Sequence, residues 1–103
     1  MKNAILIALF LVFTLTAFAA DGKSVSYKSG DETVQGTLYS PAGKGPFPAL
    51  VVIHEWWGLN DWVKEQASKL ADHGYVTLAI DLYRGKVAKT PEEAHEIMRG
   101  VPD

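Results

Sequence analysis

Apolar and polar residues alternate in two short segments of the chain, residues 25–28 and 33–39. Alternation with a period of two places one side of a strand on a core and the other side in water. Ser29-Gly30-Asp31 separates the two segments and has the composition of a tight turn. The pattern predicts a β-hairpin with one solvent-facing side.

A run of five apolar residues, Ala49 to Ile53, follows a loop rich in proline and glycine and shows no alternation. Such a run is typical of a strand that is buried on both faces of a sheet. Residues 75–80 have the same character, and the segment between the runs has helical spacing, with Asn60 as the expected N-cap and Gly74 as the expected C-cap. The apolar face of this helix holds Val63, Ala67, Leu70 and Ala71. Strand, helix and strand in about thirty residues predict a right-handed parallel βαβ unit.

A further helix is expected after the polar loop at residues 81–89, which lies where open α/β sheets bind ligands. Thr90 takes the N-cap position of this helix, Pro91 its first helical position and Glu93 closes a capping box. The inner face would hold Ala94, Ile97 and Met98. The sequence shows no internal repeat and no second domain, so the expected fold class is α/β with a sheet that is started but not finished.

The first twenty residues differ from the rest of the chain. Lys2 supplies the only charge among them, the segment from residue 4 to residue 20 is almost wholly apolar, and Ala17-Phe18-Ala19 has the A-x-A pattern of a cleavage site. We therefore expect a signal peptide over residues 1–19, a domain over residues 20–103, and export to the periplasm or the cell exterior. The cut is expected between Ala19 and Ala20 or one residue later. An uncleaved membrane anchor and a buried core helix are the alternatives.

Charge and cysteine content remove several classes of function. Loss of residues 1–19 leaves nine basic and twelve acidic residues, a formal charge of −3, with no basic stripe. Nucleic acid is therefore not an expected partner, nor is a membrane surface after signal cleavage. The chain has no cysteine, which excludes disulfides, a thiolate nucleophile within these residues and a Cys-ligated metal.

The first buried run ends on His54-Glu55, and a carboxylate at that point either leaves the core or belongs to a site. An H-E-x-x-H motif would bind zinc on a helix, but Gly58 stands at the fifth position and the pair ends a strand. The turn also lacks G-x-G-x-x-G and the Walker pattern, and Trp56 and Trp57 are too bulky for close approach to a pyrophosphate. We expect neither a metal nor a nucleotide cofactor.

The turn from His54 to Gly58 instead has the position of an oxyanion loop. In α/β-hydrolases one N–H of the oxyanion hole comes from the loop after an early central strand, and a glycine there lets the backbone bend. The segment VVIHEWWGLNDWVKEQASKLADHGYVTLAIDLYRG resembles the dienelactone hydrolase family of α/β-hydrolases, and the resemblance extends from about Thr33 to Asp103. E-x-x-G-L-N and G-Y-x-x-x-x-x-D-L-Y occur together at matching intervals.

The resemblance implies a set of site residues. Glu55 would face the catalytic nucleophile and take part in its activation, and the backbone N–H of Trp56 would contribute to the oxyanion hole. Arg84, just after the D-L-Y turn, would bind a substrate carboxylate. Apart from the resemblance, the place of Trp56, Trp57 and Trp62 beside the turn leads us to expect that they line an acyl or ring pocket. The alternatives are solvated surface side chains for Glu55 and Arg84, and plain packing for the tryptophans.

The chain also departs from the family pattern. The family triad is Cys or Ser, Asp and His, with the nucleophile on a G-x-C-x-G or G-x-S-x-G elbow beyond the region that matches here. No serine of this chain has that glycine frame, and none of the three histidines corresponds to the triad histidine. A complete fold of this kind needs about 200 to 250 residues.

We therefore expect the exported amino-terminal portion of an enzyme that hydrolyses small-molecule esters or lactones without a cofactor. Its fold would be an incomplete α/β-hydrolase fold, and the 103-residue chain alone is expected to be inactive. A secreted binding or interaction module is the alternative from a different class; its tryptophan-rich turn would hold an apolar partner, or its sheet would be completed by another chain. A broken reading frame is the third possibility.

Overall fold

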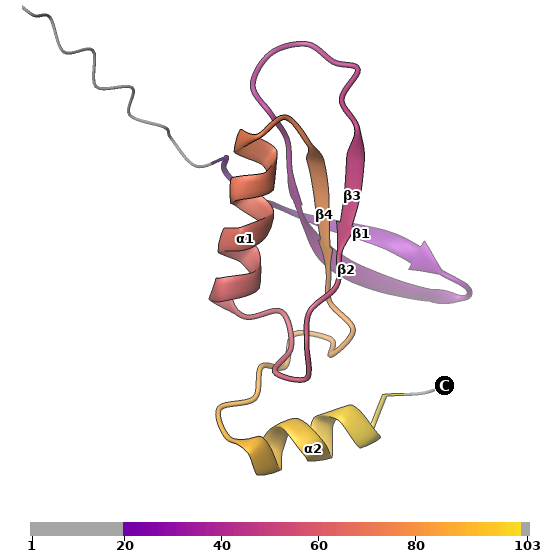
Figure 1. Ribbon diagram of the computed structural model, residues 1–103. Coiled ribbons are helices and arrows are strands. Elements are labelled where there is room, and N and C mark those ends of the chain that lie inside the picture. Colours follow the sequence, from indigo (N-terminus) through magenta and orange to yellow (C-terminus); the bar gives the residue numbers. More distant parts are fainter. Residues whose placement is uncertain (1–19, 102–103) are drawn as a thin grey trace, which may run out of the picture.

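The computed structural model describes residues 20–101, and the expected signal peptide lies outside them. The elements, in chain order, are β1 (Lys23–Ser29), β2 (Glu32–Tyr39), β3 (Ala49–Val52), α1 (Asp61–Asp72), β4 (Val76–Ile80) and α2 (Pro91–Arg99). The strands form one mixed sheet in the order β1-β2-β4-β3, and α1 lies along one face of it (Figure 1). Within the described part of the chain, no helix is long and apolar enough to cross a membrane.

The hairpin expected from the alternating segments is confirmed as β1 and β2. The two strands pair antiparallel from Lys23 opposite Leu38 to Ser29 opposite Glu32. Gly30, in the turn, has a φ of +60°, which glycine adopts without the steric cost that a Cβ would bring. The hairpin turn projects away from α1 (Figure 1).

The parallel βαβ unit is confirmed as β3, α1 and β4, because β3 pairs parallel with β4. At the start of α1, the Oδ1 of Asn60 accepts the Val63 N–H at 3.1 Å. At its end, Gly74 has a φ of +99° and its N–H donates to the Ala71 carbonyl at 3.0 Å. Both ends of the helix therefore follow the local signals that predicted them.

Helix α1 packs closely on β4 because the facing residues are small. Ala67 on the helix and Ala79 on the strand are fully buried. Thr77 is fully buried as well, and its hydroxyl donates to the Ala67 carbonyl at 2.9 Å, which avoids a penalty of about 1–3 kcal/mol for an unpaired buried group. The core cluster consists of Tyr39, Leu59, Val63, Ala67, Ala71 and Ala79.

The prediction that residues 49–53 are buried on both faces is wrong. Strand β3 ends at Val52, and Val51 and Ile53 are 62% and 65% exposed. Strand β3 stands at the edge of the sheet, and within residues 20–101 no helix packs on the face opposite α1 (Figure 1). The segment therefore has the composition of a central strand in the position of an edge strand.

Helix α2 begins at the predicted residues. The Oγ1 of Thr90 accepts the Glu93 N–H at 3.2 Å, while the Glu93 carboxylate accepts the N–H of Lys89 at 2.8 Å, one residue before the N-cap. Of the predicted inner face, Ala94 is buried, but Met98 is 45% exposed because α2 lies beyond the carboxyl ends of β3 and β4 and not on the sheet (Figure 1).

Candidate functional site

The turn between β3 and α1 is closed by its own backbone and by a glycine. The N–H of Gly58 donates to the Glu55 carbonyl at 3.1 Å, and Gly58 has a φ of +93°. A Cβ at this position would lie 2.6 Å from the carbonyl oxygen of Lys86 and 3.0 Å from the Tyr83 ring. The expected role of Gly58 in the bend is confirmed, and the neighbouring loop gives a second reason for the absence of a side chain.

His54 is a buried connection between the two loops that leave β3 and β4. Its side chain is only 7% exposed. Nε2 accepts the N–H of Leu82 at 3.1 Å, so the ring hydrogen is on Nδ1, which donates to the Glu55 carbonyl at 2.6 Å. The edge of the Tyr83 ring packs against the imidazole, with centroids 4.8 Å apart. The imidazole therefore fixes the backbone on which Glu55 stands.

No local pattern in the sequence indicates this role for His54, since the His-Glu pair there points only to a possible metal ligand. The one available signal is that a histidine at the end of a buried strand needs partners for two ring nitrogens. Its partner on the second loop is 28 residues away, beyond the reach of local patterns.

The loop after β4 is held by Asp81. Its two carboxylate oxygens accept the N–H groups of Tyr83 at 3.0 Å and Gly85 at 2.7 Å. The two loops are joined again where the N–H of Ala88 donates to the Trp57 carbonyl at 2.9 Å. Together with the His54 bond, these contacts make the carboxyl end of the parallel strand pair a single, well-connected unit.

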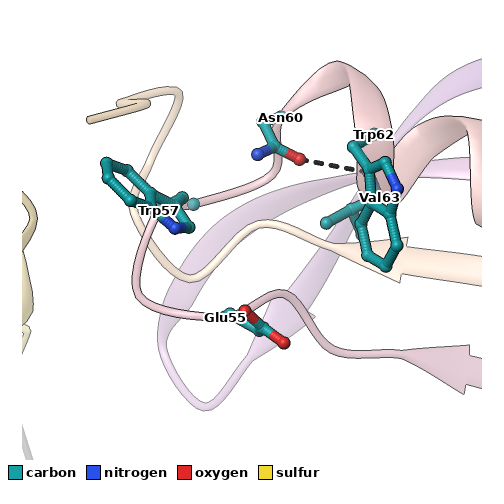
Figure 2. A pocket seen from close by; sticks show the side chains of 6 residues that line it. Glu55, Trp57, Asn60, Trp62 and Val63 are labelled. Atoms are coloured by element: carbon teal, nitrogen blue, oxygen red, sulfur yellow. Dashed lines mark hydrogen bonds between the residues drawn. The ribbon is translucent and has the colours of Figure 1, made fainter. Parts of the chain in front are cut away.

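A pocket of about 290 Å³ opens beside this turn. Figure 2 shows Glu55 and Trp57 on the turn, with Trp62 on the first turn of α1. The Glu55 side chain is exposed, Trp57 is half-buried, and Trp62 is 62% exposed. The structure therefore brings the expected catalytic carboxylate and the expected substrate-binding Trp57 together at one pocket, while the chemical roles of both residues stay predictions.

Trp56 is not among the residues that line that pocket. Its ring packs against Trp57 and against the His95 ring of α2, each with centroids 5.1 Å apart. Among residues 20–101, no backbone hydrogen bond uses the Trp56 N–H. The side chain anchors the turn on α2, and the backbone donor that would serve an oxyanion hole is not engaged by the backbone around it.

Arg84 lies apart from the Glu55 pocket. Its Nη2 is 2.6 Å from Oε2 of Glu32 on β2, and both side chains are largely exposed. Arg84 has a φ of +52° and borders a separate hollow of about 520 Å³ with Tyr27 and Leu82. The structure does not bring the expected substrate-binding arginine to Glu55 and Trp57, and its role stays a prediction.

Within the described residues, no three histidine, aspartate or glutamate side chains are grouped as metal ligands would be. The site as it stands thus has a carboxylate, aromatic walls and a backbone donor. It has no nucleophile framed by glycines, because the chain has no cysteine and none of its serines has such a frame.

Comparison with known proteins identifies matches to one family over most of the chain. Residues 34–103 match the model of the dienelactone hydrolase family. The protein usf of Aquifex pyrophilus is 36% identical over 80 residues, which are 75% of this chain and 34% of that protein. The carboxymethylenebutenolidase of Pseudomonas putida is 34% identical over 61 residues, which are 59% of this chain and 26% of the enzyme.

Solved structures give the same result for the fold. A dienelactone hydrolase-like promiscuous phosphotriesterase, P91, from metagenomic libraries matches with a TM-score of 0.68 and 33% identity over 81% of this chain and 35% of that one. The structure named m3DLH matches with a TM-score of 0.69 and 33% identity over the same shares. The chain spans about a third of the length of these solved structures.

Proposed function

The chain belongs to the dienelactone hydrolase family, and on this basis we propose that it carries the amino-terminal portion of a hydrolase acting on ester or lactone bonds. The observation that supports this most strongly is the arrangement of one turn. Glu55 lines a pocket at the carboxyl end of the parallel strands, and the next residue has a backbone N–H that no backbone acceptor within residues 20–101 engages.

In the proposed reaction, a nucleophile attacks the carbonyl carbon of the substrate and the carbonyl oxygen becomes an oxyanion. The Trp56 N–H donates to that oxygen, because a fixed donor stabilises charge that develops only in the transition state. The bond to the alcohol oxygen then breaks, and the alcohol leaves with the proton taken from the nucleophile. Water then adds its hydroxyl to the acyl carbon and its hydrogen to the nucleophile, which releases the acid and restores the enzyme. In a lactone, the alcohol and the acid stay within one product molecule.

Glu55 takes part in this scheme as the group that activates the nucleophile. A carboxylate can accept the nucleophile's proton or orient it, and a positioned base of this kind contributes about 10²- to 10⁴-fold to rate. Nδ1 of His54 donates a hydrogen bond to the Glu55 carbonyl. The backbone that carries the carboxylate is therefore held in one position. Fixed geometry of this kind is what catalysis requires.

The substrate is proposed to be a small ester or lactone. The pocket of about 290 Å³ is near the lower end of the range for ligand sites, and Trp57 and Trp62 give it aromatic walls. Arg84 is proposed to bind a substrate carboxylate, which would require its guanidinium to leave the exposed Glu32 pair and to turn towards the Glu55 pocket, which it does not line. Such an exposed pair is worth little, so the exchange is energetically accessible.

The nucleophile, the aspartate and the histidine of the triad would come from a further part of the enzyme. The test is a chimera in which residues 34–103 replace the matching segment of the Pseudomonas putida carboxymethylenebutenolidase. We expect the chimera to hydrolyse a nitrophenyl ester and an unsaturated lactone, and the 103-residue chain to hydrolyse neither.

Thermal unfolding of the chimera, followed by tryptophan fluorescence, is the control for folding. A chimera that unfolds cooperatively but has no activity on either compound would contradict the proposal. Turnover by the 103-residue chain alone would contradict the statement that the nucleophile lies elsewhere.

The second candidate is a binding or interaction module, and the exposed strand β3 favours it. Leu50 and Val51 of β3 are 38% and 62% exposed, and Ile53, just after the strand, is 65% exposed. Exposed apolar groups along an edge strand are typical of a surface that pairs with another chain. Stable, specific association of the chain together with an inactive chimera would select this candidate.

A further inference from the structure

Ala20, the first described residue, is bound through both of its backbone groups to the last turns of α1. Its N–H donates to Oδ1 of Asp72 at 3.0 Å, and its carbonyl accepts the hydroxyl of Ser68 at 2.8 Å. Ser68 is buried, with 6% exposed, and Ala20 packs against the main core cluster. These contacts join residues 48 and 52 positions apart in the sequence.

The residues after Ala20 are placed equally closely. A Cβ at Gly22 would lie 2.7 Å from the Thr37 side chain and 2.8 Å from the Tyr39 ring. The segment between Ala20 and β1 therefore packs closely against β2. Ala20 is a packed residue of the domain.

We propose that the chain is cut immediately before Ala20, and that Asp72 and Ser68 form a receptor for the amino terminus produced there. The A-x-A pattern at residues 17–19 places the cut before Ala20, with a cut one residue later as the alternative. A cut before Ala20 preserves both hydrogen bonds, whereas a cut one residue later removes the residue that makes them. The contacts of Ala20 therefore support the first of the two cuts, which is also the boundary that the sequence leads us to expect.

The cut changes the chemistry of the contact with Asp72. Hydrolysis of the Ala19–Ala20 peptide bond by an export-linked protease adds hydroxyl to the Ala19 carbonyl and hydrogen to the Ala20 nitrogen. The amide N–H becomes an amine, which takes up a proton from water near neutral pH to form an ammonium group. Its bond to the Asp72 carboxylate then becomes charge-assisted, which strengthens it. Cleavage therefore tightens the attachment of the first residue to α1, and this does not depend on the hydrolase chemistry.

The first experiment determines the cut. The full 103-residue chain is produced in a bacterium that exports proteins, and its mass is measured after denaturation, so the result does not depend on folding. We expect a chain that begins at Ala20. A chain that begins at Asp21, or one that keeps residues 1–19, would overturn the proposal.

The second experiment tests the receptor. The processed chain is incubated with an aminopeptidase, and loss of Ala20 is followed by mass spectrometry for the wild type, Asp72→Asn and the control Glu65→Gln. Glu65 is an exposed carboxylate on the same helix that pairs with Lys69. We expect Asp72→Asn to lose Ala20 several-fold faster than the other two. Equal rates for all three would overturn the receptor, and so would rapid trimming of the wild type.

Thermal unfolding gives a second readout of the same contact. We expect Asp72→Asn to lower the melting temperature of the processed chain by about 8 °C or less. The difference should shrink when salt is raised to about 1 M, because salt screens exposed charges. A melting temperature difference that is unchanged by salt would contradict an ion pair.

Discussion

The Nε2 of His54 accepts a hydrogen bond from the backbone N–H of Leu82 at 3.1 Å, across 28 residues of sequence. This bond joins the loop after β3 to the loop after β4, at the carboxyl end of the two parallel strands, next to Glu55. The second ring nitrogen holds the Glu55 carbonyl. One side chain therefore positions both the carboxylate and the adjacent backbone donor of the proposed site.

Replacement of His54 by alanine should destabilise the chain by about 1–3 kcal/mol, because the Leu82 N–H would lose its acceptor in a partly buried place. The measurement is urea unfolding followed by tryptophan fluorescence. His73→Ala is the matched control, since the His73 ring contacts the Lys69 carbonyl at an exposed helix end. Equal losses for the two variants would contradict the role of His54.

Replacement of Gly58 by alanine should be more harmful than replacement of Gly85, although the two have φ values of +93° and +87°. Backbone strain is common to both sites and costs about 1 kcal/mol. Only at Gly58 would the new Cβ meet a backbone oxygen, at 2.6 Å from Lys86, whereas at Gly85 nothing lies within 4 Å. The difference between the unfolding free energies of the two variants measures the cost of the contact with the Lys86 carbonyl. Equal unfolding free energies would show that this contact has no cost.

Tyr39 should make the stability fall at high pH. Burial, with a further effect of Asp61, raises the pKa of Tyr39, while tyrosine in the unfolded chain titrates at about 10. The folded state therefore keeps its proton to higher pH than the unfolded state. Its contribution to stability is complete below pH about 10 and is lost as the pH rises towards the folded pKa.

The measurement is the unfolding free energy of the wild type and Tyr39→Phe between pH about 9 and 11. The phenylalanine variant has no proton to lose and should decline less steeply. If the unfolding free energies of the two proteins fall in parallel as the pH rises, Tyr39 does not account for the loss of stability at high pH.

Replacement of Val51 and Ile53 by lysine should reduce self-association of the chain and cost little stability. Both side chains are more than half exposed, so few contacts within the domain are lost, and charge on an edge strand opposes pairing with other chains. Analytical ultracentrifugation measures the association. An unchanged association constant would show that self-association does not use the surface of β3.

The parts of the fold that were predictable depend on neighbouring residues. Asn60, Thr90 and Gly74 act within one helical turn, so their caps could be recognised from the sequence. Burial of residues 49–53 was not predictable in the same way, because it depends on what lies on both sides of the strand and composition does not report that.

The site divides in the same manner. The turn from His54 to Gly58 could be located from its residue types and its place after a strand. The bond from His54 to Leu82 and the pair between Arg84 and Glu32 could not, because their partners are 28 and 52 residues away. A connection of that length is a property of the folded chain.

The most direct test of the proposed site is the kcat of the active chimera with Glu55→Gln, compared with Glu65→Gln on the exposed face of α1. Glutamine keeps the size of Glu55 but cannot accept the nucleophile's proton, so kcat should fall about 10²- to 10⁴-fold, while Glu65→Gln should leave it unchanged. Equal kcat values for Glu55→Gln and Glu65→Gln would contradict a catalytic role for the carboxylate at the end of β3.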